Sequence, residues 1–205
     1  LGVIGDVGIY VFRSYNTTVT DNIASSRDVA AINIHHSNYT TVTNNNATAE
    51  APNPDLNLGD GMVLIDVHFS TIANNHIRAV QSAALVVFDN PPTENMTNTR
   101  NRIDNNTIIG QNTMGLTIYP HSNLNNFTNN TISALGTVAA MDIRTASNNT
   151  FIDNDFESNG SFAIQFIGIS RDHNFTNSII KTNNTWISTG SLALRNNFTN
   201  TTFSR

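Results

Sequence analysis

The sequence predicts an all-β solenoid of about eight coils, each coil being one turn of a parallel β-helix. Two observations lead to this fold class. A short phrase, an apolar residue followed three positions later by Asn, recurs along the chain with a period of about 24 residues. Within each copy, apolar and polar residues alternate. A fixed period of this length indicates stacked repeats that bury one shared core, and the alternation indicates strands.

The repeat is aligned on its first apolar residue. That column consists of Val19, Val42, Ile72, Ile103, Phe127, Phe151, Phe175 and Phe198. Five residues further on stands a second apolar column, Ala24, Ala47, Ile77, Ile108, Ile132, Phe156, Ile180 and Phe203. Apolar residues that recur at the same place in every coil should face the shared core, so we expect the four Phe side chains of the first column to stack inside it.

Each copy predicts three short strands. Alternating pairs such as Ile32/Ile34 and Met62/Leu64 form the first strand, and the two apolar columns form the second and third. In the last copy the first strand could contain either Ile187 or the pair Leu192/Leu194. Eight coils at the strand spacing of about 4.8 Å would form a rod roughly 40 Å long.

A polar column stands three residues after the first apolar column. Its members are Asn22, Asn45, Asn75, Asn106, Asn130 and Asn154, followed by Ser178 and Thr201. A sharp turn between strands needs a residue that tolerates left-handed backbone angles, which Asn does better than other residues with a side chain. Amides stacked on successive coils can also hydrogen-bond in a ladder. We therefore expect the six Asn to be structural.

Two other solenoids have a similar period or ladder. A leucine-rich repeat also has a period of about 24 residues. Its L-x-x-L-x-L run is missing here, because Thr17 and Asn125 stand where it requires Leu. A left-handed β-helix would show a hexapeptide period, and none is present.

The repeat resembles the right-handed parallel β-helix repeat of pectin-lyase-like proteins, in particular NosD-type repeats, over residues 8–203. The resemblance implies the fold but no single activity, because this scaffold carries lyases, hydrolases, epimerases, adhesins and structural proteins.

The 205 residues predict a single domain, 1–205, which we expect to be part of a longer chain or of a polymer. The repeat is still running at Arg205 and residues 1–4 are apolar, so further chain or self-association would cover the ends of the β-helix. Two Pro- and Asn-rich insertions, at 51–60 and 89–101, predict surface loops. In this fold both would wall a groove over the first-strand face at coils two to four, which is where related enzymes bind polysaccharide.

Composition excludes some partners and points to a compartment. The formal net charge of −5 and the absence of Lys/Arg clusters argue against nucleic acid. No apolar run is long enough to predict a membrane span. N-x-S/T sites are frequent, which favours an extracellular or cell-envelope glycoprotein. The candidate glycosylation sites are Asn16, Asn38, Asn46, Asn95, Asn105, Asn126, Asn129, Asn148, Asn159, Asn174, Asn183, Asn197 and Asn200.

The candidate residues for chemistry are few. His36 and Asp66 each stand six residues before the first apolar column, which places them on adjacent coils about 5 Å apart, close enough for a His–carboxylate pair. His68, Asp89 and His121 complete the set of weak catalytic candidates. Such a set could supply a general base or a weak metal site, but a solvated polar corner is the simpler interpretation.

A zinc site is not expected from the sequence. The chain has no Cys, and the adjacent pair His35-His36 should place its side chains on opposite sides of a strand. Calcium is the one ion that we leave open, and no other cofactor is expected. Asn33 and Asp142 share a second outward column but lie several coils apart.

The resemblance also implies what an enzyme of this fold would show. A hydrolase would carry three clustered Asp with a nearby His and an Arg-x-Lys, and a lyase would carry an acidic calcium site with a catalytic Arg or Lys; neither is recognisable. We therefore predict an extracellular or cell-envelope structural or adhesive protein, self-assembling and in contact with carbohydrate. The alternative is a polysaccharide lyase, hydrolase or epimerase. Convergence of His36, Asp66, His68 and Asp89 on one walled groove would favour the enzyme.

Overall fold

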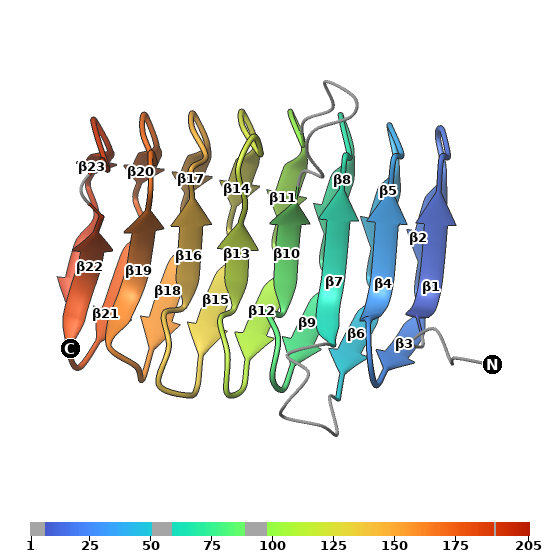
Figure 1. Cartoon of the computed structure of the whole chain (residues 1–205), viewed down its shortest axis with the longest axis horizontal. Helices are drawn as coiled ribbons and strands as arrows, with labels where there is room; N and C mark the ends of the chain where they lie inside the picture. The colour runs from blue at the N-terminus through green and yellow to red at the C-terminus, as the bar shows by residue number, and fades with distance from the viewer. Residues whose placement is uncertain (1–6, 51–58, 89–97, 191) are drawn as a thin grey trace.

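The structure is a computed structural model that describes residues 7–50, 59–88, 98–190 and 192–205. Twenty-four strands and no helix occur in these residues, and the coils stack along one axis (Figure 1). Every coil contributes three strands, so coil one holds β1 to β3, coil two β4 to β6, and so on to coil eight. Across the described ranges there is accordingly no helical segment with the length and hydropathy needed to cross a membrane.

The strands form three parallel sheets of eight strands each. The first sheet, which faces the viewer in Figure 1, consists of β1 (Val7–Phe12), β4 (Ala30–His35), β7 (Asp60–Ile65), β10 (Leu85–Phe88), β13 (Leu116–Ile118), β16 (Met141–Arg144), β19 (Phe162–Ile167) and β22 (Thr185–Thr189). The second consists of β2 (Thr18–Thr20), β5 (Thr41–Thr43), β8 (Thr71–Ala73), β11 (Arg102–Asp104), β14 (Asn126–Thr128), β17 (Thr150–Ile152), β20 (Asn174–Thr176) and β23 (Asn197–Thr199). The third consists of β3 (Ile23–Ser26), β6 (Asn46–Ala49), β9 (His76–Ala79), β12 (Thr107–Gly110), β15 (Thr131–Ala134), β18 (Asp155–Ser158), β21 (Ile179–Thr182) and β24 (Thr202–Ser204).

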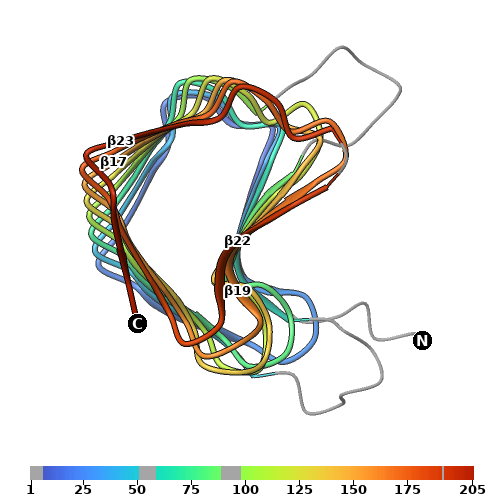
Figure 2. The same ribbon diagram turned by 90° about the vertical axis from the view of Figure 1, so that its left-hand side faces the viewer.

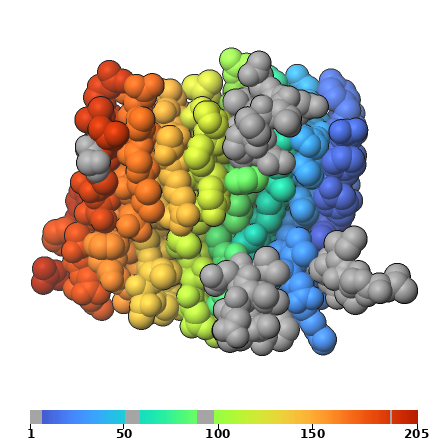
Figure 3. All heavy atoms as spheres, in the orientation of Figure 1, coloured from blue at the N-terminus to red at the C-terminus, as the bar shows by residue number. Residues whose placement is uncertain are grey.

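The three sheets enclose one core. Viewed along the axis, the coils superpose around a common interior (Figure 2), and the space-filling view shows them as successive bands of one continuous body (Figure 3). Each coil pairs only with its neighbours, in the order of the sequence. The predicted all-β solenoid of about eight coils, with the period expected from the sequence, is therefore confirmed.

The predicted Phe stack lies in the core. Phe127, Phe151, Phe175 and Phe198 occupy one register column of the second sheet. Successive ring centroids are 4.8, 4.5 and 4.6 Å apart and the rings are nearly parallel. The first three rings are fully buried and Phe198 is half-buried. In the last coil Ile187 fills the first strand, because it pairs with Ile164 of β19.

The six Asn of the polar column are buried or nearly so and hydrogen-bond from coil to coil. The Nδ2 of each donates to the Oδ1 of the next at 3.0 Å, without interruption from Asn22 to Asn154. The same Oδ1 also accepts the backbone N–H of the Asn on the preceding coil.

One reason given for this column was wrong. The ladder Asn do not adopt left-handed angles; the residue before each of them does. That position holds Asp21, Asn44, Asn74, Asn105, Asn129, Asp153, Asn177 and Asn200. Two adjacent positions of the repeat therefore have different requirements. The first needs an exposed residue that tolerates positive φ, and the second needs a buried amide that both donates and accepts hydrogen bonds.

The structure also contains a second buried polar column, which the sequence analysis missed. It lies two residues before the first apolar column and includes Asn101, Asn125 and Asn149. Asn101 Nδ2 donates to Asn125 Oδ1 at 3.1 Å, and the backbone N–H of Asn125 donates to Asn149 Oδ1 at 2.9 Å. On coil seven the position is taken by His173, whose Nδ1 accepts the backbone N–H of Asn149.

The limits of both predicted insertions need correction. Asp60 begins β7, so it belongs to the first strand of coil three. Asn98 and Asn101 are buried members of coil four: Asn98 Oδ1 accepts the backbone N–H of Val67 at 2.8 Å. Asn-rich sequence predicts surface loops, but in this fold Asn is also a buried turn residue. The remaining parts, 51–58 and 89–97, lie outside the described residues.

Candidate functional site

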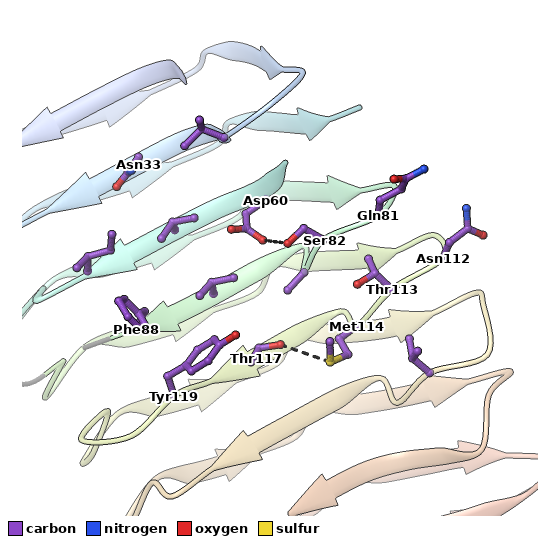
Figure 4. Close-up of a pocket in the computed structure, with 16 residues that line it drawn as sticks. Asn33, Asp60, Gln81, Ser82, Phe88, Asn112, Thr113, Met114, Thr117 and Tyr119 are labelled. Atoms are coloured by element: carbon purple, nitrogen blue, oxygen red, sulfur yellow. Dashed lines mark hydrogen bonds between the residues drawn. The ribbon is translucent and has the colours of Figure 1, made fainter. Parts of the chain in front are cut away.

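A groove crosses the outer face of the first sheet over coils two to five. It has a volume of about 670 Å³ and is lined from four neighbouring strands, β4, β7, β10 and β13 (Figure 4). The register column Asn33–Val63–Val86–Thr117 forms its floor. Val63 and Val86 belong to a small apolar cluster separate from the core, together with Ala30 and Ala83. The groove therefore lies over the face that the sequence analysis predicted, and extends one coil further.

An aromatic pair forms one side of the groove. Phe88 and Tyr119 follow each other on adjacent coils, with ring centroids 5.2 Å apart and planes at 88°. The guanidinium of Arg144 lies 5.2 Å from the centre of the Tyr119 ring and is paired with Asp142 at 2.7 Å. Arg144 thus holds the tyrosine ring from outside the groove, because neither Arg144 nor Asp142 lines it.

Asp60 is the ionisable carboxyl group of the groove lining. Its Oδ1 accepts the hydroxyl hydrogen of Ser82 at 2.5 Å, and both residues point into the groove (Figure 4). Burial raises the pKa of Asp60 from 3.8 to about 6, although the Ser82 hydroxyl and the backbone of Ala83 act in the opposite direction. A carboxyl group with this pKa exchanges a proton near neutral pH. The sequence places Asp60 near the groove but inside the first insertion, and for that reason it was not among the catalytic candidates.

Neutral polar side chains also line the groove. Asn112 is exposed and Gln81 half-buried, whereas Asn33, Thr113 and Thr117 are buried. Asn33 Oδ1 has no hydrogen-bond partner among the described residues. An apolar floor with a few polar groups at its margin is the usual make-up of a small-molecule or sugar site.

The catalytic candidates of the sequence analysis do not line this groove. His36 and Asp66 lie on adjacent coils as expected, with Nδ1 and Oδ2 3.1 Å apart. His68 Nδ1 lies 3.1 Å from Thr99 Oγ1, and burial lowers the pKa of His68. His121 is exposed in a left-handed turn. Asp89 lies outside the described residues. The described candidates therefore do not converge on the groove.

The prediction for the pair His35-His36 was wrong. The two imidazole rings do not point to opposite sides; they stack with centroids 4.1 Å apart. His35 is the last residue of β4, and His36 follows with φ of 50°, so the strand alternation has already ended at the second His. The two rings and the Asp66 carboxylate form one cluster.

A second set of aromatic side chains lies at the turn before the second sheet. Tyr15, Tyr39 and Phe69 are exposed: Tyr39 and Phe69 stack at 5.2 Å between centroids, and Tyr15 contacts Tyr39 at 5.1 Å with the ring planes tilted by 59°. Arg100 covers the far face of the stack, 5.5 Å from the Phe69 ring centre. Tyr39 and Phe69 therefore cover one face of each other, which leaves fewer ring faces free to stack on a sugar. Tyr119, in the groove, is better placed for such a contact.

Solved structures with a similar fold come from several kinds of protein. A double mutant of the periplasmic alginate epimerase AlgG is 17% identical, with a TM-score of 0.77 over 95% of this chain and 47% of that one. The Geobacillus virus E2 protein ORF18 is 15% identical, with a TM-score of 0.66 over 96% and 40%. The A-module of the Azotobacter vinelandii mannuronan C-5 epimerase AlgE4 is 13% identical, with a TM-score of 0.60 over 92% and 55%.

These likenesses show the fold alone, since identity is low, and the chain spans about half the length of the proteins it matches. A search of curated proteins gave no significant match. The sequence family described as "right handed beta helix region" matches residues 4–132, which is more than half of the chain. Together with the three parallel sheets and the one-coil register, this match shows that the chain belongs to the right-handed β-helix family.

Proposed function

We propose that this chain is an extracellular or cell-envelope β-helix protein of structural or adhesive type, and that its groove binds a segment of polysaccharide. The groove over β4, β7, β10 and β13 carries this proposal. Sugar rings present an apolar face and a margin of hydroxyl groups. The valine floor and the Tyr119 ring match the apolar face, and the accessible side chains of Gln81 and Asn112 match the hydroxyl groups.

The charge of the groove favours a neutral polysaccharide over a uronic acid polymer. Among the described lining residues Asp60 is the single acidic side chain, and there is no Lys or Arg. The formal charge of the whole chain is −5. A polyanion would have to bring its carboxylates against Asp60 without a cation to offset them, which costs free energy in a partly desolvated site. The epimerases of similar fold are named for alginate and mannuronan, so a different substrate class is proposed here.

The placement of the glycosylation candidates supports an extracellular location. Asn95 lies outside the described residues, and the other candidates are exposed except for the half-buried Asn38. Asn16, Asn105, Asn129, Asn148 and Asn200 lie at left-handed turns, and Asn46, Asn126, Asn174 and Asn197 begin strands. Exposed acceptor sites are what glycosylation requires. The alginate epimerase AlgG, which has a similar fold, is periplasmic, and this gives further, weaker support for an envelope location.

Binding of oligosaccharides to purified protein tests the proposal. Isothermal titration with neutral hexasaccharides and with oligouronates should give saturable binding to a neutral sugar. Tyr119→Ala removes the stacking ring and should weaken binding at least tenfold, whereas the matched control Tyr15→Ala, an exposed tyrosine outside the groove, should leave it unchanged. Circular dichroism verifies that both variants keep the fold. Equal binding by both variants, or binding of oligouronates only, would contradict the proposal.

The second candidate function is a polysaccharide-active enzyme, and the pKa of Asp60, raised to about 6, favours it. This carboxyl could act as a general acid or base. Two requirements are missing from the described groove: a glycosidase ordinarily needs two carboxyl groups, and proton abstraction beside a uronate needs a cation to hold the substrate's carboxylate. Binding is therefore the better-supported function.

Turnover separates the two candidates. Incubation of the protein with neutral and acidic oligosaccharides, followed by NMR of the products, should leave every substrate unchanged. If a product forms, and if Asp60→Asn abolishes its formation while oligosaccharide binding persists, the enzyme hypothesis replaces the binding hypothesis.

A further inference from the structure

Three metal-binding side chains gather at the end of β4 and β7, outside the groove. They are His35, His36 and Asp66, and one donor atom of each lies within 4.8 Å of the donor atoms of the other two. The cluster joins coil two to coil three, because His35 and His36 come from one coil and Asp66 from the next. Among the described residues this is the one group of at least three His, Cys, Asp or Glu with such geometry.

The backbone explains why the three side chains converge. His36 and Asp66 occupy the same turn position on adjacent coils, with φ of 50° and 51°. The left-handed turn breaks the strand alternation directly after His35, so the side chain of His36 comes to the same side as that of His35. Two ligands adjacent in sequence can thus face one point, which a regular strand would prevent.

The donor distances suit a small tetrahedral ion. His36 Nδ1 and Asp66 Oδ2 are 3.1 Å apart. An ion with metal–ligand bonds of about 2.0–2.1 Å needs donor separations of roughly 3.3 Å in a tetrahedron, so this pair is nearly in place. The other donor separations are within 4.8 Å. Asp66 is 2% exposed, which holds its carboxylate in position.

Neighbouring side chains orient the two imidazoles. Tyr10 Oη lies 3.1 Å from Nδ1 of His35, so this nitrogen is already engaged. His35 Nε2 is buried and has no hydrogen-bond partner within the part of the chain that the structure describes. The Phe12 ring packs edge-on against both imidazoles, at 5.3 and 5.8 Å between centroids. A ring nitrogen held by an outer partner while the other nitrogen is free is the usual arrangement of a ligating histidine.

We propose that His35, His36 and Asp66 bind a divalent transition-metal ion, with zinc the best match, and that the ion clamps coil two to coil three. Two nitrogens and one carboxylate oxygen are common zinc ligands, and water would complete the tetrahedron. Calcium prefers a shell of oxygen ligands, so the cluster is unsuited to it. The guanidinium of Arg13, which lies over the Phe12 ring, adds a nearby positive charge that limits the affinity.

Titration of the full chain with zinc chloride, after removal of metals by a chelator, tests the site. We expect one zinc per chain, a rise in melting temperature on binding, and no response to calcium. His35→Ala should abolish the saturable binding and the rise in melting temperature. His68→Ala is the matched control, because His68 lies near Asp66 but outside the cluster, and its zinc affinity should equal that of the unmodified chain.

Two further measurements address the geometry. Tyr10→Phe keeps the ring and removes the hydroxyl that orients His35, so we expect zinc affinity to fall about tenfold with the fold unchanged. Cobalt(II) substitution should give the intense visible absorption of a tetrahedral site in the unmodified chain and not in His35→Ala. No saturable zinc binding, or binding that is unaffected by His35→Ala, would overturn the proposal, as would weak octahedral-type cobalt absorption.

Discussion

At the scale of single residues, the buried amides explain how this chain turns sharply in coil after coil without leaving backbone groups unpaired. Asn106 shows the arrangement. Its Oδ1 accepts both the backbone N–H and the Nδ2 of Asn75, while its own Nδ2 lies within hydrogen-bond distance of the Ile72 carbonyl and of Asn130 Oδ1. A buried backbone group without a partner would cost about 1–3 kcal/mol, so each ladder residue satisfies a need of the neighbouring coil.

Removing one amide of the ladder should therefore be costly. We expect Asn106→Ala to lower the free energy of unfolding by about 2–4 kcal/mol, because it leaves two donors of Asn75 unpaired and removes the side-chain donor to the Ile72 carbonyl. Asn126→Ala, at an exposed strand position, should cost less than about 0.5 kcal/mol. Urea unfolding followed by circular dichroism measures both. If both substitutions lowered the free energy of unfolding equally, the ladder hydrogen bonds would not be a source of stability.

His173 replaces Asn in the second buried column and should make stability depend on pH. Burial lowers the pKa of His173 from 6.5 to about 4, outweighing its hydrogen bond with the Ala146 carbonyl. Between these two values the unfolded chain binds a proton that the folded chain does not. Stability is thus retained above pH 6.5 and is lost as the pH falls towards 4.

The expected acid effect is about 2–3 kcal/mol on going from pH 7 to pH 4.5. Asp60 acts in the opposite direction, because its folded pKa is raised to about 6 and the folded chain binds the extra proton. The test is therefore a difference between variants. Denaturant midpoints of the unmodified chain and of His173→Asn, taken at both pH values, should show a smaller acid loss in the variant. An identical pH dependence would mean that His173 is protonated equally in both states.

At the scale of elements, the Phe stack ties the second sheet together along the axis. Phe151 is fully buried, with Phe127 on one side and Phe175 on the other, and Phe156 contacts its edge. Phe198 is half-buried. The same side chain at the same register position therefore has different surroundings along the sheet.

The cost of truncation should follow those surroundings. Phe151→Ala should destabilise the chain by roughly 3–5 kcal/mol, since it removes a buried ring and leaves a cavity. Phe198→Ala should cost about half as much, because less apolar surface returns to water. Thermal or urea unfolding of the two variants gives the comparison. A larger effect at Phe198 would contradict the assigned burial.

The sequence was sufficient for the strands and columns because the fold repeats them. The period and the alternation of apolar residues placed the column from Val19 to Phe198 correctly, because the same pattern occurs in every coil. Sequence reasoning failed where a residue type has two uses. Asn98 was assigned to a surface loop because Asn is common in loops, but it is buried. The alternation of side chains gave the wrong orientation for His35-His36, because the strand ends between these two residues. The groove residues Val63 and Val86 could not be found, because an outward apolar column looks like core in a sequence.

At the scale of the whole molecule, stability and recognition are distributed differently. Each coil contacts only its neighbours, so folding depends on every regular coil, whereas the groove needs coils two to five together. Both insertions predicted from the sequence interrupt the coils that line the groove. That they carry recognition, and that copies of the chain associate through their ends, stay predictions.

Deletions in the second insertion should distinguish loop from coil. Removing 90–96 should leave unfolding cooperative, because the described residues Phe88 and Asn98 on either side of it are in contact, so a short connection can join them. Removing 90–99 also takes out Asn98, whose side chain bonds Val67 and the Leu64 carbonyl, and should cost about 2–4 kcal/mol more. Equal stability of the two deletions would place Asn98 outside the coil.

The central claim is that sugar binds on the outer face of the first sheet, and methyl NMR tests it most directly. Neutral oligosaccharide added to protein with labelled Ile, Leu and Val methyl groups should shift the signals of Val63, Val86 and Ile65, which line the groove. The signals of Ile23 and Ile179, exposed on the third sheet, should stay in place. Shifts confined to the third sheet, or no shift at saturating sugar, would contradict the account.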